Sequence, residues 1–158
     1  MPLLIELKAN DKIIINGAVI ENTSNTSTKL MLHNQASILR EREILAEEEA
    51  TTPASRVYYD LQCAYVFKEH REQHMTKFRL DLGDYIAACP SAMPIANDIN
   101  DLVDAEKFYK ALKKSKELII HEANTFKDLH DRLLRLTEDG VLDADGSEED
   151  ENDNAAKR

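Results

Sequence analysis

The sequence predicts an α+β protein in which a small antiparallel β-sheet precedes a helical bundle and a disordered acidic tail. Three observations lead to this fold class. Residues 1–48 carry strand-like alternation and short β-branched runs, residues 49–137 carry apolar residues at helical spacing, and residues 138–158 are rich in acidic residues. Apolar residues make up 42% of the 158 residues, which is enough for a core, and Gly and Pro number only four each. This composition favours long regular elements and the domain boundaries given by the three segments.

The β-rich part contains several strand signals. The segments expected to form strands are residues 3–8, 13–15, 18–20, 29–33 and 37–40. Asn16-Gly17 interrupts the apolar run and predicts a hairpin turn, because both residues tolerate a positive φ angle. One long strand over residues 12–21 with a glycine bulge is the alternative. Such a thin sheet needs a helix layer or a second copy of itself to cover its apolar face.

The helical part begins at Thr51-Thr52-Pro53, where a Thr cap precedes a Pro at the first helical position. Three segments with apolar residues at helical spacing follow, at residues 57–65, 75–86 and 95–103. Residues 104–136 contain no Gly or Pro and form either one long helix or two helices that break near residues 122–124. Gly140 is the expected stop.

The net charge of −10 is unevenly distributed. Residues 138–158 contain nine acidic and two basic residues, so this segment has a net charge of −7 and the remainder about −3. Because the tail has little to bury and a high charge density, we expect it to be disordered. The nearly balanced remainder neither excludes nor supports nucleic-acid binding by a local patch.

Several classes of protein are disfavoured by the absence of their signals. The N-terminus lacks the basic start of a secretory signal, and no stretch approaches the roughly 20 apolar residues of a membrane span, so we expect a cytoplasmic protein without membrane contact. Cys63 and Cys89 lack CxxC spacing and are expected to be reduced and buried. His70 and His74 are four residues apart, but Arg71 stands where a zinc peptidase has its Glu. We therefore predict no enzyme, no metal and no cofactor.

Basic residues in and near the predicted sheet are the candidates for contact with RNA. The candidate residues are Lys12, Lys29, His33, Asn34, Arg40, Arg42 and Arg56. Arg40 and Arg42 are two apart, so on a strand both side chains would leave the same face, with Glu41 and Glu43 on the other. Residues 1–45 contain no Phe, Tyr or Trp, which excludes an RNA-recognition-motif surface. The alternative is an ordinary solvated sheet with salt bridges.

Four segments resemble the FlbT family of flagellum biosynthesis regulators from α-proteobacteria. They are IIINGAVIEN (13–22), LHNQASILRE (32–41), EEATTPASRVYYDLQCAYV (48–66) and FYKALKKSKELIIHEA (108–123). The resemblance implies a protein that associates with the 5′ untranslated region of flagellin mRNA and promotes its decay or represses its translation. It does not settle the sign of regulation, since some members favour flagellin production. It implies no catalytic residues.

A second functional class is compatible with the same sequence. In this alternative the chain is a protein-binding adaptor or chaperone-like module whose amphipathic helices bind flagellin or a second flagellar regulator, with no direct RNA contact. The balanced charge of residues 1–137 and the missing aromatics in the β-rich part favour this alternative. A homodimer is expected if either the sheet or the helical half associates with a second copy.

Overall fold

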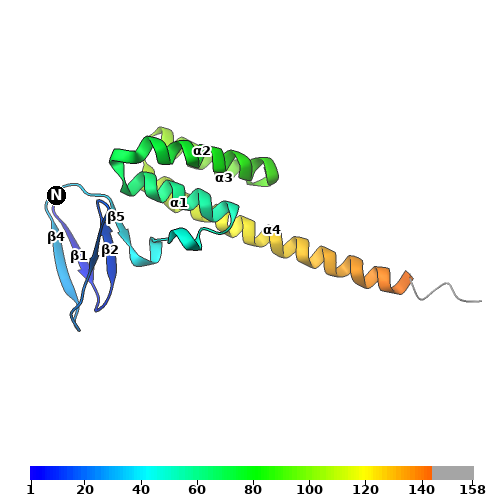
Figure 1. The fold of residues 1–158 in the computed structure, drawn as a ribbon, viewed down its shortest axis with the longest axis horizontal. Helices are drawn as coiled ribbons and strands as arrows, with labels where there is room; N and C mark the ends of the chain where they lie inside the picture. Colours follow the sequence, from blue (N-terminus) through cyan, green and yellow to red (C-terminus); the bar gives the residue numbers. More distant parts are fainter. Residues whose placement is uncertain (144–158) are drawn as a thin grey trace, which may run out of the picture. The chain divides into compact units, whose positions relative to one another are not determined.

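The computed structural model describes the backbone of residues 1–143 and the side chains of residues 1–138 (Figure 1). The strands are β1 (Leu3–Leu7), β2 (Lys12–Ile15), β3 (Ala18–Glu21), β4 (Thr28–Leu32) and β5 (Ile38–Arg40). The α-helices are α1 (Pro53–Val66), α2 (Arg71–Ala88), α3 (Met93–Asp104) and α4 (Phe108–Asp143). Short 3-10 turns are η1 (Glu41–Glu43), η2 (Glu47–Glu49), η3 (Lys68–His70) and η4 (Pro90–Ala92). The predicted α+β fold class is confirmed.

The chain consists of two units. Residues 1–121 form one compact unit, and the part of α4 from residue 122 onward belongs to the other. The first unit holds both sheets and α1, α2 and α3, so the β-rich and helical parts share it. The domain boundaries expected after residues 48 and 137 stay a prediction based on composition.

The β-structure is divided between two antiparallel sheets. β1 pairs with β4, and β2 lies between β3 and β5 in a three-stranded sheet. Ile5 and Leu7 of β1 form a small core with Ile13 of β2, so the two sheets pack against each other. Ile5, Leu7 and Ile13 are therefore covered within the chain, whereas Leu4, Met31 and Val19 remain exposed.

β2 is apolar on both faces because it lies between two cores. Ile13 is fully buried against Ile5 and Leu7 of the two-stranded sheet. Ile14 instead packs against the helical core, which also contains Leu39 of β5. A strand that is covered on both sides needs a continuous apolar run, which explains the three consecutive isoleucines.

The hairpin predicted at Asn16-Gly17 is confirmed. Both residues have positive φ angles, of 50° and 86°, and the flanking residues Ile15 and Ala18 pair across the turn. Gly17 also lies against the helical part. A Cβ atom added at Gly17 would stand 3.2 Å from the Phe67 ring, which is tighter than an ordinary van der Waals contact.

We expect Gly17→Ala to destabilise the protein by about 1–3 kcal/mol, because the new methyl group adds left-handed backbone strain and a contact with Phe67. The matched control is Gly83→Ala in α2, where a Cβ atom would meet nothing within 4 Å. That substitution should stabilise by about 0.5–1 kcal/mol, because it removes a glycine from a helix interior. Urea denaturation measures the change in the free energy of unfolding for both variants. A change of the same sign in both would contradict the conformation of the turn.

The predicted start of the helical part is confirmed in detail. Thr52 is the N-cap of α1, and its side chain accepts a hydrogen bond from the Ser55 backbone N–H at 3.2 Å. The Ser55 hydroxyl accepts from the Thr52 backbone N–H at 2.8 Å in return, and Pro53 occupies the first helical position. These contacts satisfy backbone donors that the helix itself leaves unpaired.

The last helix differs from the prediction at both ends. α4 is one continuous helix through residues 122–124, and it passes Gly140 and ends at Asp143. A single glycine costs a helix only about 1 kcal/mol, which is too little to stop it here. Residues 138–143 are thus helical rather than part of a disordered tail, whereas residues 144–158 of that tail lie outside the described residues. The predicted stretch 104–136 is interrupted instead at residues 105–107.

A buried carboxyl pair lies between α1 and α2. Asp60 is 1% exposed, and its Oδ1 atom is 3.1 Å from the Lys77 ammonium. The Oδ2 atoms of Asp60 and Asp81 are both buried without a hydrogen-bond partner. Burial and the neighbouring Asp81 carboxyl raise the pKa of Asp60 from 3.8 to about 6, against the opposing effect of Lys77.

The sign of the resulting pH dependence follows from linkage. An acid whose pKa is raised in the folded state loses stability as the pH rises from its unfolded pKa to its folded pKa, here from 3.8 to about 6. We expect Asp60→Asn to stabilise the protein at pH 7 by about 1–2 kcal/mol, after allowing for the lost contact with Lys77. At pH 4 the gain should be smaller. Urea denaturation at both pH values tests this, and a loss of stability at pH 7 would contradict it.

Candidate nucleic-acid interface

Three of the predicted RNA-binding residues gather on one hollow of about 630 Å³, which we call the strand surface. It is lined by Glu6, Leu7, Lys8, Asp11, Lys12, Arg40, Glu41 and Arg42. Four of these side chains are basic and three are acidic, so their charges nearly cancel. The predicted gathering of Lys12, Arg40 and Arg42 is present, but the surface is not the uniformly positive face that was expected.

The predicted arrangement of Arg40 and Arg42 is wrong. β5 ends at Arg40, and Arg42 lies in the turn η1, so the two side chains do not leave one strand. The turn forms because the Glu43 carboxylate accepts from the Arg40 backbone N–H at 3.1 Å and thereby ends the strand. Glu41 does not point away either, since its carboxylate accepts from the Lys12 backbone N–H at 3.4 Å.

The remaining candidates are dispersed. Lys29 of β4 lies opposite Glu6 of β1, so an acid accompanies its charge. Arg56 is exposed on α1, where its Nε atom donates to the Thr52 carbonyl at 3.5 Å. It lines neither the strand surface nor the larger pocket described next. His33 and Asn34 follow β4 and line a second, larger pocket.

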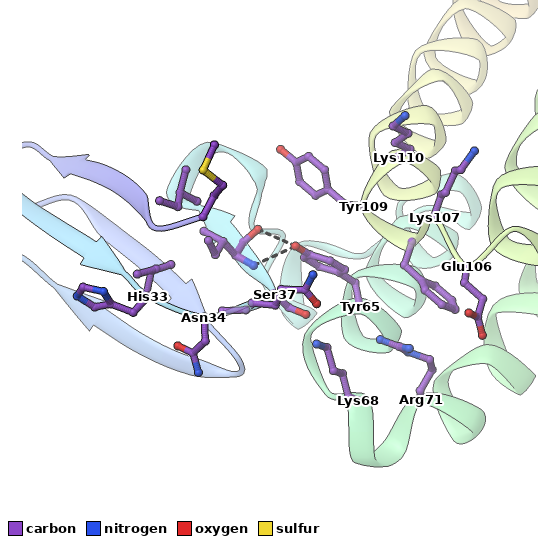
Figure 2. Close-up of a pocket in the computed structure, with 17 residues that line it drawn as sticks. His33, Asn34, Ser37, Tyr65, Lys68, Arg71, Glu106, Lys107, Tyr109 and Lys110 are labelled. Atoms are coloured by element: carbon purple, nitrogen blue, oxygen red, sulfur yellow. Dashed lines mark hydrogen bonds between the residues drawn. The ribbon is translucent and has the colours of Figure 1, made fainter.

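This larger pocket, which we call the junction pocket, has a volume of about 960 Å³ (Figure 2). Its lining comes from three segments and the N-terminus: Met1, Leu3, residues 32–38, Tyr65, Lys68, Arg71 and residues 106–110. All of them belong to the first unit. Figure 2 shows His33 and Asn34 across the pocket from Lys107 and Tyr109.

The junction pocket concentrates positive charge in an acidic protein. Four cationic side chains line it, from Lys68, Arg71, Lys107 and Lys110, and the single acid among the lining residues is Glu106. Positive charge in a hollow raises the local concentration of anions even when the whole chain is negative. None of these four residues is among the predicted ones, because they lie outside the predicted sheet in sequence and only folding brings them to it.

Aromatic side chains lie among these cations. Tyr65 and Tyr109 have ring centroids 5.7 Å apart and planes tilted by 41°. The guanidinium carbon of Arg71 lies 4.2 Å from the centroid of the Phe108 ring. The helices thus supply the aromatic groups that residues 1–45 lack. The signal that could have found them is the run FYKALKK at residues 108–114, which combines two aromatic and three basic residues.

Hydrogen bonds hold the two tyrosines in place. The Tyr65 hydroxyl accepts from the Ile38 backbone N–H at 2.9 Å, and the Tyr109 hydroxyl donates to Glu43 Oε1 at 2.7 Å. The bond to Glu43, together with burial, raises the pKa of Tyr109 to about 12. Burial would raise the pKa of Glu43, but the hydrogen bonds from Tyr109 and Arg40 help to lower it. At neutral pH the Glu43 carboxylate is therefore ionised and accepts the hydrogen bond from the neutral Tyr109 hydroxyl. This arrangement suits binding rather than proton transfer.

The turn between α3 and α4 holds Glu106, the acidic residue that lines the junction pocket. Glu106 has a φ angle of 56°, which is a left-handed conformation. Its N–H donates to the Val103 carbonyl at 2.9 Å, and the Lys107 N–H donates to the Leu102 carbonyl at 2.8 Å. This pair of bonds is a Schellman motif, whose left-handed position usually holds glycine. The motif ends α3 and turns the chain into α4.

We expect Glu106→Gly to stabilise the protein by about 0.5–1 kcal/mol, because glycine adopts the left-handed conformation without strain. Glu106→Gln is the matched control: it removes the same charge and keeps the strain, so its stability should be unchanged. Thermal melting distinguishes the two variants. An equal gain in both would mean that the charge of Glu106, and not its backbone, is the destabilising element.

Among the described residues, no three His, Cys, Asp or Glu side chains are placed to hold a metal ion. Cys63 and Cys89 are free thiols, and only Cys63 is fully buried. No helix within residues 1–143 is both long enough and apolar enough to cross a bilayer.

A family model of the flagellar protein FlbT matches residues 3–126. The chain belongs to the FlbT family. The resemblance inferred from the four segments is therefore confirmed, and the match includes every lining residue of the junction pocket except Met1.

Several members of the FlbT family are similar over most of their length. A probable flagellum biosynthesis repressor protein FlbT 1 of Bradyrhizobium diazoefficiens is 39% identical over 77% of this chain and 83% of its own. A probable flagellum biosynthesis repressor protein FlbT of Caulobacter sp. strain K31 is 36% identical over 77% of this chain and 94% of its own. The flagellum biosynthesis repressor protein FlbT of Caulobacter vibrioides is 33% identical over 77% and 87%. No solved structure matches the chain.

Proposed function

We propose that this chain is a regulator of flagellum biosynthesis that associates with the 5′ untranslated region of flagellin mRNA and promotes its decay or represses its translation. Membership of the FlbT family and the repressor names of its relatives support the regulatory role. The regulator acts in the cytoplasm, where the message is translated. The junction pocket supports direct contact with RNA.

The observation that carries RNA contact is the composition of the junction pocket. Lysine and arginine bind phosphates and release counterions, which gives affinity without sequence preference. Aromatic rings stack on unpaired bases, which positive charge alone cannot do. The pocket combines four cations with the rings of Tyr65, Phe108 and Tyr109. This combination is typical of RNA-binding surfaces and is unusual in a chain with a net charge of −10.

Binding acts on the message through occupancy of the leader. A protein seated on the leader blocks initiation or exposes the rest of the message to nucleases. In this proposal a separate nuclease degrades the message, and this chain supplies recognition.

Titration of purified protein into a labelled flagellin leader tests the proposal. A scrambled RNA of equal length is the control. We expect tighter binding to the leader, and a plot of log affinity against log salt with a slope of about −2 to −3, because three or four phosphates are neutralised. Absence of binding at 50 mM salt, or a slope of zero, would overturn the proposal.

A second candidate function, a protein-binding adaptor, is favoured by one feature of α4. Phe126, Leu129, Leu133 and Leu136 recur at intervals of three and four residues and are each more than half exposed. Such a stripe is typical of a helix that binds another helix. Replacing Leu129 and Leu133 with Ser decides between the functions. An adaptor would lose its binding of flagellin or of its partner regulator. An RNA-binding regulator would keep its affinity for the leader.

A further inference from the structure

We propose that the junction pocket selects single-stranded RNA, by stacking an unpaired base on the wall formed by Tyr65 and Tyr109 while surrounding lysines hold the adjacent phosphates. This inference rests on the proposed function and names the form of RNA that the same site takes. Three observations support it. The tyrosine rings lie deeper than the lysine ammonium groups, hydrogen bonds fix the rings in place, and polar side chains face them.

The rings and the charges of the pocket lie at different depths. Tyr65 and Tyr109 are half-buried, whereas Lys68, Lys107 and Lys110 are exposed. Phosphates on the outside of any RNA can reach the exposed ammonium groups. A base can reach the recessed rings only if it leaves its stack, which bases of a duplex do not do without a cost. The pocket therefore offers a duplex only part of the contacts that it offers a single strand.

The wall is fixed before any RNA arrives. Tyr65 is held by the Ile38 backbone and Tyr109 by Glu43, through the hydrogen bonds at 2.9 Å and 2.7 Å. Fixed rings lose little conformational freedom on binding, so more of the stacking energy is available as affinity. Lys113 now lies over the Tyr109 ring, with its ammonium 5.3 Å from the ring centroid. The Lys113 side chain is exposed, so a base can take its place and leave the ammonium to bind a phosphate.

Polar groups opposite the wall suit the edge of an extruded base. His33, Asn34 and Gln35 are exposed on the loop between β4 and β5 and line the same pocket (Figure 2). Amide side chains both donate and accept hydrogen bonds, as the edges of unpaired bases do. The pocket thus provides a stacking surface, phosphate contacts and hydrogen-bonding groups in one place, which is what recognition of a single strand needs.

Three ligands of equal length test this inference on the full chain. They are the single-stranded leader, the same strand annealed to its complement, and an abasic strand that carries phosphates without bases. At equal salt we expect the single strand to bind roughly 10-fold or more tightly than either of the others, because only it can stack. Equal affinity for all three would overturn the inference while leaving leader binding intact. Absence of binding to every ligand would overturn the proposed function itself.

Two substitutions of one residue test the role of the ring. Tyr109→Phe keeps the ring and loses the bond to Glu43, and it should stay within roughly 3-fold of the unchanged protein on the single strand. Tyr109→Leu removes the ring and should weaken binding of the single strand roughly 5- to 100-fold, with little effect on binding of the duplex or the abasic strand. Thermal melting verifies that both fold. A Leu variant that folds and binds the single strand normally would overturn the inference, and the ligand comparison decides it if that variant does not fold.

Discussion

Phe78→Ala is expected to lower the free energy of unfolding by about 3–5 kcal/mol, because the ring is fully buried in the helical core and a cavity remains when it is removed. The matched control is Leu80→Ala on the same helix. Leu80 is 63% exposed, so its truncation should change stability by less than about 0.5 kcal/mol. Urea denaturation with a constant m-value measures both variants.

The contrast between Phe78 and Leu80 tests which face of α2 is buried. Phe78 belongs to the core that also contains Leu61 of α1 and Leu39 of β5. If Leu80→Ala costs as much as Phe78→Ala, the face of α2 that is described as exposed is covered, and the packing of α1 on α2 is wrongly described.

Replacing Lys68, Lys107 and Lys110 together with alanine is expected to weaken binding of the leader roughly 10- to 100-fold at 50 mM salt. The salt slope should become less steep by about 2, because three fewer counterions are released. These lysines are exposed and line the junction pocket, so their removal leaves the core unchanged. Fluorescence anisotropy at several salt concentrations measures both quantities.

The strand surface supplies the control for this experiment. Replacing Lys12, Arg40 and Arg42 with alanine removes the same number of positive charges from a hollow whose acids already balance them. We expect a smaller loss of affinity and a smaller change of slope than for the junction pocket. The opposite order would return the RNA contact to the residues that the sequence alone suggested.

The elements that could be predicted from sequence are those with local signals. Asn16-Gly17 and Thr52-Pro53 carry the conformational preferences of a hairpin turn and a helix start in the residues themselves. The division of the strands into two sheets could not be predicted, because it depends on which core receives each isoleucine of β2. Periodicity describes one strand at a time and contains no information on its neighbours.

The turn at Glu106 shows a second limit. A left-handed residue at a helix end is usually glycine, and a glutamate there carries no such signal, so residues 104–108 appeared continuously helical. Conversely, Gly140 carries the signal of a stop, but α4 passes it. Propensities of about 1 kcal/mol for each residue are easily outweighed by neighbouring contacts.

The candidate site could be predicted least. His33 and Asn34 are predicted residues that line the junction pocket, and most of the other lining residues come from residues 65–71 and 106–110. No spacing in the sequence relates these three segments, since folding alone brings them together. Arg40 and Arg42 were placed on one face by assuming that the strand continues, whereas the capping contact of Glu43 ends it. Short-range patterns therefore supplied two of the residues that line the pocket, but neither its cations and aromatic rings nor their assembly.

Ultraviolet crosslinking of the labelled leader to the full chain, followed by mass spectrometry of the crosslinked peptides, tests direct RNA contact at the junction pocket. Aromatic rings that stack on bases crosslink efficiently, so the predicted result is crosslinks at Tyr109 or Tyr65, with further ones in residues 33–36. Competition by unlabelled leader should remove them, and scrambled RNA should not. Crosslinks confined to the strand surface, or none at all under conditions in which the leader is bound, would contradict the account.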